Sequence, residues 1–253
     1  MSREAALAQT VDQDGTVPRV ARRSRFFQRM SVLLLALVFA GFARTLFLRP
    51  VFQVPPIPWY LYVHGIVLTA WFALLVVQSS LIAARRTDLH RRLGIAGAIL
   101  AVAVVGTGLV AILGMPSRLR SLDLATKALT VWTSFAFIVA FSILVTAALS
   151  LGHRPEVHRR LMLLASVAII GPALGRIGLL LSQAGVPSAL ALISVNILVW
   201  VGLPVMLMVH DFRVARRLHT ASIWGTTAFF VLLIGAIAVS SSGLGRALVK
   251  ALE

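Results

Sequence analysis

Residues 128–149 read ALTVWTSFAFIVAFSILVTAAL, an apolar run without a single charged side chain. A helix of about 20 mainly apolar residues is long enough to cross the hydrocarbon core of a bilayer. Other stretches of similar character recur along the chain, so we expect spans at residues 30–48, 60–83, 93–113, 128–149, 161–181, 189–209 and 223–239. The sequence therefore predicts an all-α integral membrane protein, a helical bundle of about seven transmembrane helices.

The overall composition agrees with lipid as the main solvent. Of the 253 residues, 59% are hydrophobic and 13% are charged, whereas soluble domains carry roughly 25% charged residues. We expect a polar, basic and disordered N-terminal tail over residues 1–29, one transmembrane domain over 30–242 and a short tail over 243–253. Such a chain has the lipid bilayer as its main partner, and an extramembrane catalytic domain is excluded.

The distribution of positive charge predicts the orientation. The net charge of +16 comes from Lys and Arg at the ends of the apolar runs, so it indicates topology and not nucleic-acid binding. The N-terminal tail and the loops after the second, fourth and sixth spans hold 16 of the 24 basic residues. By the positive-inside rule the N-terminus is cytoplasmic and the C-terminus lies outside.

The first span has an alternative interpretation as a cleaved signal. Gly41-Phe42-Ala43 resembles a small-residue cleavage site behind a basic segment and an apolar run. The polar leader is long, however, and the apolar run continues to Leu48, which favours a membrane anchor. Cleavage would leave six spans in the same orientation.

Histidines gather at the cytoplasmic ends of the predicted spans: His90, His153, His158, His210 and His219. Neutral imidazole binds haem iron, zinc, copper and non-haem iron. Nearby carboxylates, at Asp88, Glu156 and Asp211, are expected to support such a site or to act as ligands. The alternative is that these histidines lie at the headgroup boundary as amphipathic anchors. The chain has no cysteine, which excludes disulfides, thiolate metal ligands and covalent haem attachment.

A second polar pattern follows the second span. His64, Trp71 and Gln78 are spaced by seven residues and therefore share one helix face. Asn196 lies on the sixth span, and polar groups in hydrocarbon usually face the bundle interior. We expect these four side chains to form a polar seam, either as hydrogen-bonding glue between helices or as a pathway for a cofactor or substrate.

Arg176 lies deep in the fifth span, and no Asp or Glu falls inside any predicted span. It must extend to the outer headgroups, meet backbone carbonyls near Pro172 or face an anion. With Arg44 and Lys127 it is expected to form an outer basic pocket for a lipid phosphate or an acidic small molecule.

Several of these residues carry a family resemblance. They are His64, Trp71 and Gln78, followed by Leu89-His90-Arg91-Arg92-Leu93-Gly94, His158-Arg159-Arg160-Leu161-Met162-Leu163-Leu164-Ala165 and Arg217-Leu218-His219-Thr220-Ala221-Ser222-Ile223-Trp224-Gly225. From about Tyr60 to Gly225 the chain resembles a bacterial membrane-protein family described only as a domain of unknown function. The resemblance implies a bacterial cytoplasmic (inner) membrane protein and implies no reaction.

A more distant similarity is to membrane-bound b-type cytochromes, which hold haem between histidines of neighbouring helices. It implies at most one cytoplasmic-side haem, because His64 is the only outer histidine.

Three functions remain open from the sequence. The first is a redox-associated protein that binds one b-type haem or a metal through His90 and His158, with His210 and His219 as alternates. The second is a non-enzymatic binding or assembly module that holds lipid or a partner membrane subunit. The third is a small-solute transporter. No catalytic residue is predicted.

Overall fold

The computed structural model describes residues 19–252. The helices are α2 (Arg19–Phe42), the π-helical turn η1 (Ala43–Phe47), α3 (Arg49–Phe52), α4 (Trp59–Ala83), α5 (Thr87–Leu113), α6 (Met115–Arg118), α7 (Leu124–Ser150), α8 (Pro155–Ala168), α9 (Gly171–Gln183), α10 (Ser188–Trp200), α11 (Gly202–Ala215), α12 (Thr220–Ser241) and α13 (Gly243–Ala251). This described part contains no strand. The predicted all-α bundle is confirmed.

The long helices account for the expected spans. Over residues 19–252, six helical segments are long and apolar enough to cross a membrane, and a seventh results if the bent pair α8–α9 is one span. Pro172 explains the bend of 47° between α8 and α9, because it has no N–H to donate to the preceding turn. The chain is thus a multi-pass membrane protein.

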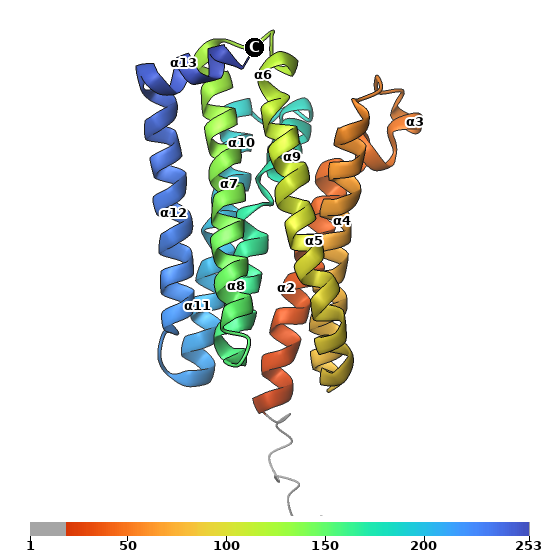
Figure 1. Ribbon diagram of the computed structural model, residues 1–253, viewed down its shortest axis with the longest axis vertical. Helices are drawn as coiled ribbons and strands as arrows, with labels where there is room; N and C mark the ends of the chain where they lie inside the picture. The colour runs from red at the N-terminus through yellow and green to blue at the C-terminus, as the bar shows by residue number, and fades with distance from the viewer. Residues whose placement is uncertain (1–18, 253) are drawn as a thin grey trace, which may run out of the picture.

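The long helices run side by side along one axis (Figure 1). At one end, drawn at the bottom of the figure, lie the start of α2 and the loops 84–86, 151–154 and 216–219. We call this the arginine-rich end, because Arg85, Arg86, Arg154, Arg216 and Arg217 are in those loops. The short helices α3, α6 and α13 lie at the opposite end.

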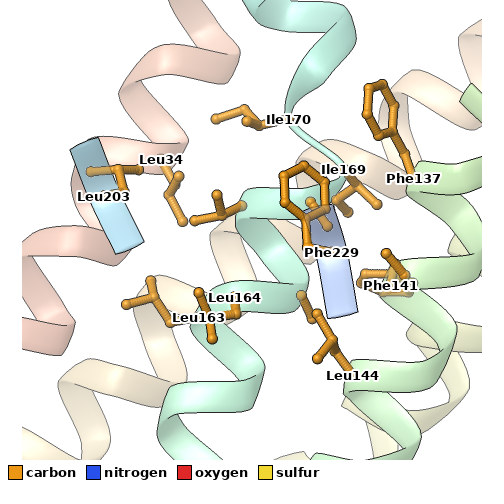
Figure 2. Packing of buried hydrophobic residues seen from close by; sticks show 14 of the residues in the cluster. Leu34, Phe137, Phe141, Leu144, Leu163, Leu164, Ile169, Ile170, Leu203 and Phe229 are labelled. Carbon is orange, nitrogen blue, oxygen red and sulfur yellow. The ribbon is translucent and has the colours of Figure 1, made fainter. Parts of the chain in front are cut away.

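The core is centred on α8 and its continuation into α9. Every residue from 163 to 171 is buried, as expected for a helix that is surrounded on all sides. Leu164 of α8, Phe141 of α7 and Phe229 of α12 belong to one buried apolar cluster (Figure 2). Because α8 is surrounded by other helices, its polar side chains also face neighbouring helices, as Ser166 and Arg160 do.

Both expected tail segments contain helix, and for residues 19–29 this corrects the expectation of a disordered tail. Residues 19–29 are helical and extend α2, because the basic stretch has no breaker after Pro18 and Phe26 stacks on His210, with ring centres 4.1 Å apart. The rest of the expected tail, residues 1–18, lies outside the described residues. Residues 243–251 form α13, whose start is capped by Ser242, and Trp132 of α7 donates a hydrogen bond to the Gly245 carbonyl.

Candidate functional site

Two of the four candidate cofactor histidines lie together at the arginine-rich end. The rings of His90 on α5 and His158 on α8 meet edge-on, with centres 6.2 Å apart. His158 Nδ1 lies 2.8 Å from the carbonyl oxygen of Ala148. Since a carbonyl only accepts, Nδ1 carries the hydrogen and Nε2 of the neutral ring keeps its lone pair. This pair is the part of the expected histidine set that resembles a binding site.

The two alternates have other surroundings. The His210 ring stacks on Phe26 and meets the edge of Phe27. His219 caps α12, where its Nδ1 accepts a hydrogen bond of 3.1 Å from the Ala221 amide. Within residues 19–252, no three His, Asp or Glu side chains gather into a metal site.

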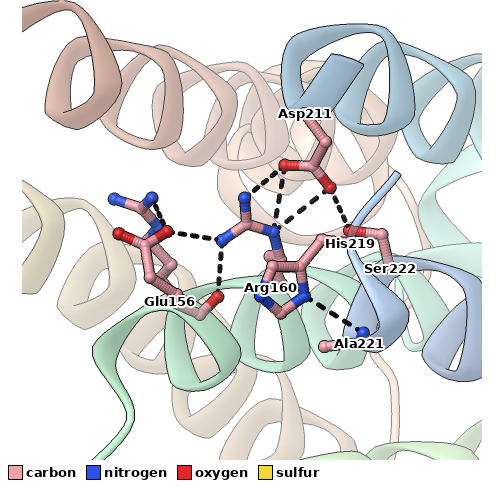
Figure 3. Close-up of polar contacts among 7 residues, drawn as sticks. Glu156, Arg160, Asp211, His219, Ala221 and Ser222 are labelled. Carbon is pink, nitrogen blue, oxygen red and sulfur yellow. Dashed lines mark hydrogen bonds and ion pairs between the residues drawn. The ribbon is translucent and has the colours of Figure 1, made fainter. Parts of the chain in front are cut away.

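Beside these histidines lies an ion cluster around the buried Arg160 and Asp211 (Figure 3), which the sequence pattern does not predict. We define the Arg160 cluster as Glu156 and Arg160 of α8, Asp211 of α11 and Ser222 of α12. The Arg160 Nε lies 3.0 and 3.2 Å from the two Asp211 carboxylate oxygens, and Nη1 lies 2.9 Å from Glu156 Oε2. Ser222 Oγ donates to Asp211 Oδ2 at 2.6 Å. The cluster joins three helices and satisfies a buried charge pair.

The sequence does contain a signal for this cluster. Asp211 is the only acidic residue between residues 157 and 252, so any buried arginine in that region has one carboxylate to pair with. The predicted sixth span ended at residue 209, whereas α11 continues to Ala215 and carries Asp211 inside the helix. Burial, and then repulsion by the Arg160 guanidinium, lowers the pKa of His219 below its ordinary value of 6.5.

Three of the four residues of the expected polar seam make hydrogen bonds to a neighbouring helix. His64 Nδ1 lies 3.1 Å from the Thr107 hydroxyl on α5. Trp71 Nε1 donates to Ser166 Oγ on α8 at 3.1 Å, and the Gln78 amide donates to the His90 carbonyl at 3.2 Å. These three side chains of α4 thus link it to α5 and α8.

The fourth seam residue, Asn196, is not part of this set. Its amide donates to the Leu192 carbonyl one turn back on its own helix. The hydrogen bonds of His64, Trp71 and Gln78 are the kind that the interpretation as glue between helices expects. A pathway for a cofactor or substrate stays a prediction.

Two of the three expected outer basic residues share a pocket at the opposite end. Arg44 of η1 and Arg176 of α9 line a cavity of about 380 Å³, together with the segment 52–55. Lys127 is not among its lining residues and lies buried on α7. Gly41 also lines the pocket, and there α2 and α9 touch, since a Cβ on Gly41 would lie 2.5 Å from the Ala173 carbonyl oxygen.

Both guanidinium groups in this pocket are held in place by neutral partners. Arg44 Nη1 donates to Gln183 Oε1, and Arg176 Nη1 donates to the Pro172 carbonyl, each at 2.9 Å. The Arg176 guanidinium carbon lies 4.4 Å from the ring centre of Phe42. Each arginine thereby keeps further N–H donors for a ligand, since a guanidinium has five.

Comparisons with protein-family models, with curated proteins and with solved structures found no match for this chain. The resemblances noted from the sequence stay predictions.

Proposed function

We propose that this protein is a non-enzymatic membrane binding protein that holds an anionic phospholipid, with the lipid phosphate between Arg44 and Arg176. The observation that carries this proposal is one cavity lined by two guanidinium groups and by no carboxylate. Arginine forks bind phosphate oxygens in a bidentate manner, which suits a phosphodiester headgroup.

The charge balance around the pocket favours an anion. Residues 15–87 and 157–210, which include every element that lines the pocket, contain no Asp or Glu. Electrostatic repulsion from Arg118 also reaches Arg176, so a third positive charge lies nearby. Positive charges at this depth are costly unless an anion or an ordered network compensates them. A bound phosphate would remove that cost.

The surroundings of the pocket favour an amphiphile over a small soluble anion. Leu179 and Leu180 line it, and both are exposed on the surface of α9. A phospholipid would place its phosphate on the arginines and its acyl chains along this apolar surface. The volume also falls in the range of pockets that hold small ligands, about 300–1,000 Å³.

We place the arginine-rich end in the cytoplasm of a bacterial cell, and the pocket in the outer leaflet of the inner membrane. The support is the excess of arginine in the loops 84–86, 151–154 and 216–219, to which the positive-inside rule applies. In that orientation the ligand would be a lipid of the outer leaflet.

Lipid binding can be tested with the purified full chain in a neutral detergent. We expect phosphatidylglycerol to raise the melting temperature and phosphatidylcholine to raise it less, because only the former has a net negative headgroup. Native mass spectrometry should show one retained phosphatidylglycerol. In R44Q/R176Q, the apparent affinity for phosphatidylglycerol should decrease at least about tenfold. The thermal shift and the amount of retained lipid should decrease with it.

The matched control is R120Q, which removes an exposed arginine at the same end of the bundle. It should bind phosphatidylglycerol like the wild type. Inorganic phosphate is the second arm, because stabilisation by phosphate alone would indicate a soluble anion as the ligand. Equal lipid binding by R44Q/R176Q and the wild type would reject the proposed function.

A further inference from the structure

Next to the His90–His158 pair, two enclosed polar atoms have no hydrogen-bond partner among residues 19–252. They are His90 Nδ1 and Gln78 Oε1. Gln78 is held against His90, because its amide nitrogen donates to the His90 carbonyl. Buried polar atoms are usually paired, so two such atoms on neighbouring side chains call for a ligand.

The atoms at this place are electron-pair donors. The amide oxygen of Gln78 can only accept, and His158 Nε2 has its lone pair because Nδ1 donates to Ala148. His90 Nδ1 supplies another lone pair in the tautomer that is protonated on Nε2. A set of two imidazoles and one amide oxygen, drawn from α4, α5 and α8, suits a borderline transition metal.

The spacing of the rings is compatible with a shared metal centre. Two imidazoles on one ion have ring centres about 5–6 Å apart, because each metal–nitrogen bond is about 2.0–2.1 Å long. The observed separation is 6.2 Å. The hydrogen bond from His158 to Ala148 is also the kind of contact that orients a metal-binding histidine.

Neighbouring arginines would repel a cation, but those on α8 are neutralised. Arg160 is paired with Asp211 and with Glu156, and Arg159 is paired with Glu156. Arg91 and Arg92 follow His90 and are exposed, where solvent screens their charge. The Arg160 cluster therefore lowers the positive potential beside His158.

From these observations we infer that His90 and His158, with support from Gln78, bind one transition-metal centre at the arginine-rich end. The centre is either a bare ion such as Zn²⁺, Ni²⁺ or Cu²⁺ or the iron of a haem, since imidazole binds both. This site is on different helices from the lipid pocket and does not depend on it.

The experiment uses the full-length protein without a polyhistidine tag. Metal content of the protein as isolated is measured by mass spectrometry, and binding of Zn²⁺, Ni²⁺ and Cu²⁺ to the stripped protein is measured by equilibrium dialysis. A reduced-minus-oxidised absorption spectrum of the isolated protein distinguishes haem iron from a bare ion. We expect one centre per chain, and H90A and H158A should each weaken its binding about tenfold or more.

H153A is the matched control, because His153 lies exposed in the loop 151–154. It should bind the metal as the wild type does. The melting temperature with and without metal is the second readout, because it remains informative for a variant that is less stable. Metal should raise the melting temperature of the wild type and of H153A, and should raise that of H90A much less. If H90A and H158A bind metal and haem as the wild type does, or if H153A loses as much binding as they do, the site does not exist.

Discussion

Arg160 of α8 and Asp211 of α11 face each other as a side-by-side ion pair inside the protein. Arg160 is 4% exposed and Asp211 is 0% exposed. The pair lies 51 residues apart in sequence, and Ser222 completes it from α12. Because one side chain from each of three helices is required, this pair defines how α8, α11 and α12 are placed relative to one another.

Replacing Asp211 with Asn should destabilise the protein strongly. The variant leaves Arg160 charged and buried with only Glu156 to compensate it, and breaking a buried pair costs about 3–5 kcal/mol. Unfolding of D211N in mixed detergent micelles measures this loss. R213Q, an exposed change on the same helix, should stay within about 0.5 kcal/mol of the wild type. If D211N were as stable as R213Q, the pair would have no structural importance.

His219 should make stability depend on pH. Its pKa in the folded protein is below the ordinary 6.5, through burial and the nearby Arg160. Below about pH 6.5 the unfolded chain therefore binds more protons at this position, and the free energy of unfolding should decrease as the pH falls. In H219N the side chain can still cap α12 but cannot titrate.

Melting temperatures between pH 7.5 and 5.5 test this prediction. The wild type should lose more stability over this range than H219N. H153N, which changes an exposed loop histidine, should follow the wild-type curve. Parallel curves for H219N and the wild type would show that His219 does not contribute.

Replacing Gly41 of α2 or Gly175 of α9 with Ala should change the stability of the protein in different ways. A Cβ on Gly41 would lie 2.5 Å from the carbonyl oxygen and 2.8 Å from the Cα of Ala173, both rigid backbone atoms. G41A should therefore cost about 1–3 kcal/mol through overpacking and should push α2 and α9 apart at the wall of the lipid pocket. Nothing lies within 4 Å of a Cβ on Gly175, so G175A should be neutral or should stabilise α9 by up to about 1 kcal/mol. Thermal unfolding of both variants is the measurement, and equal effects would contradict the close approach.

The proposed orientation can be checked by labelling. Because the natural chain has no cysteine, single variants give a clean signal. A membrane-impermeant thiol reagent should label S121C on intact cells and should label H153C only after the cells are opened. Both positions are exposed in loops at opposite ends of the bundle. Labelling of H153C on intact cells would reverse the orientation.

The sequence was sufficient to predict the fold class, because hydropathy alone separates spans from loops. It was less informative about where helices begin and end. Residues 19–29 and the end of α11 are helical but polar or amphipathic, and a criterion based on apolar length leaves such extensions out. The bend between α8 and α9 follows from Pro172, but its angle depends on how α9 packs against α2 and α10.

The candidate sites were predictable only where one element or a repeated pattern carried the information. The heptad spacing predicts that His64, Trp71 and Gln78 share one face of α4, and each of them makes a hydrogen bond to a neighbouring helix. The sequence prefers His90 and His158 as a ligand pair, and their rings do lie together, whereas the surroundings of His210 and His219 depend on which helices are neighbours and could not be deduced. For the same reason the sequence pattern indicates only a topology signal at Arg160 and not its pairing with Asp211.

The pairing of Arg160 with Asp211 also has a consequence for how the chain is made. The ribosome adds about 5–20 residues per second, so Asp211 emerges about 3–10 s after Arg160, given their separation of 51 residues. Throughout that interval α8 carries an arginine whose final counter-charge does not yet exist. We expect α8 to wait at the membrane surface with its N-terminal turn hydrated, and to take its central place only when α11 and α12 arrive. The order of synthesis would then differ from the order of assembly, and the helix at the centre of the bundle would be among the last to settle.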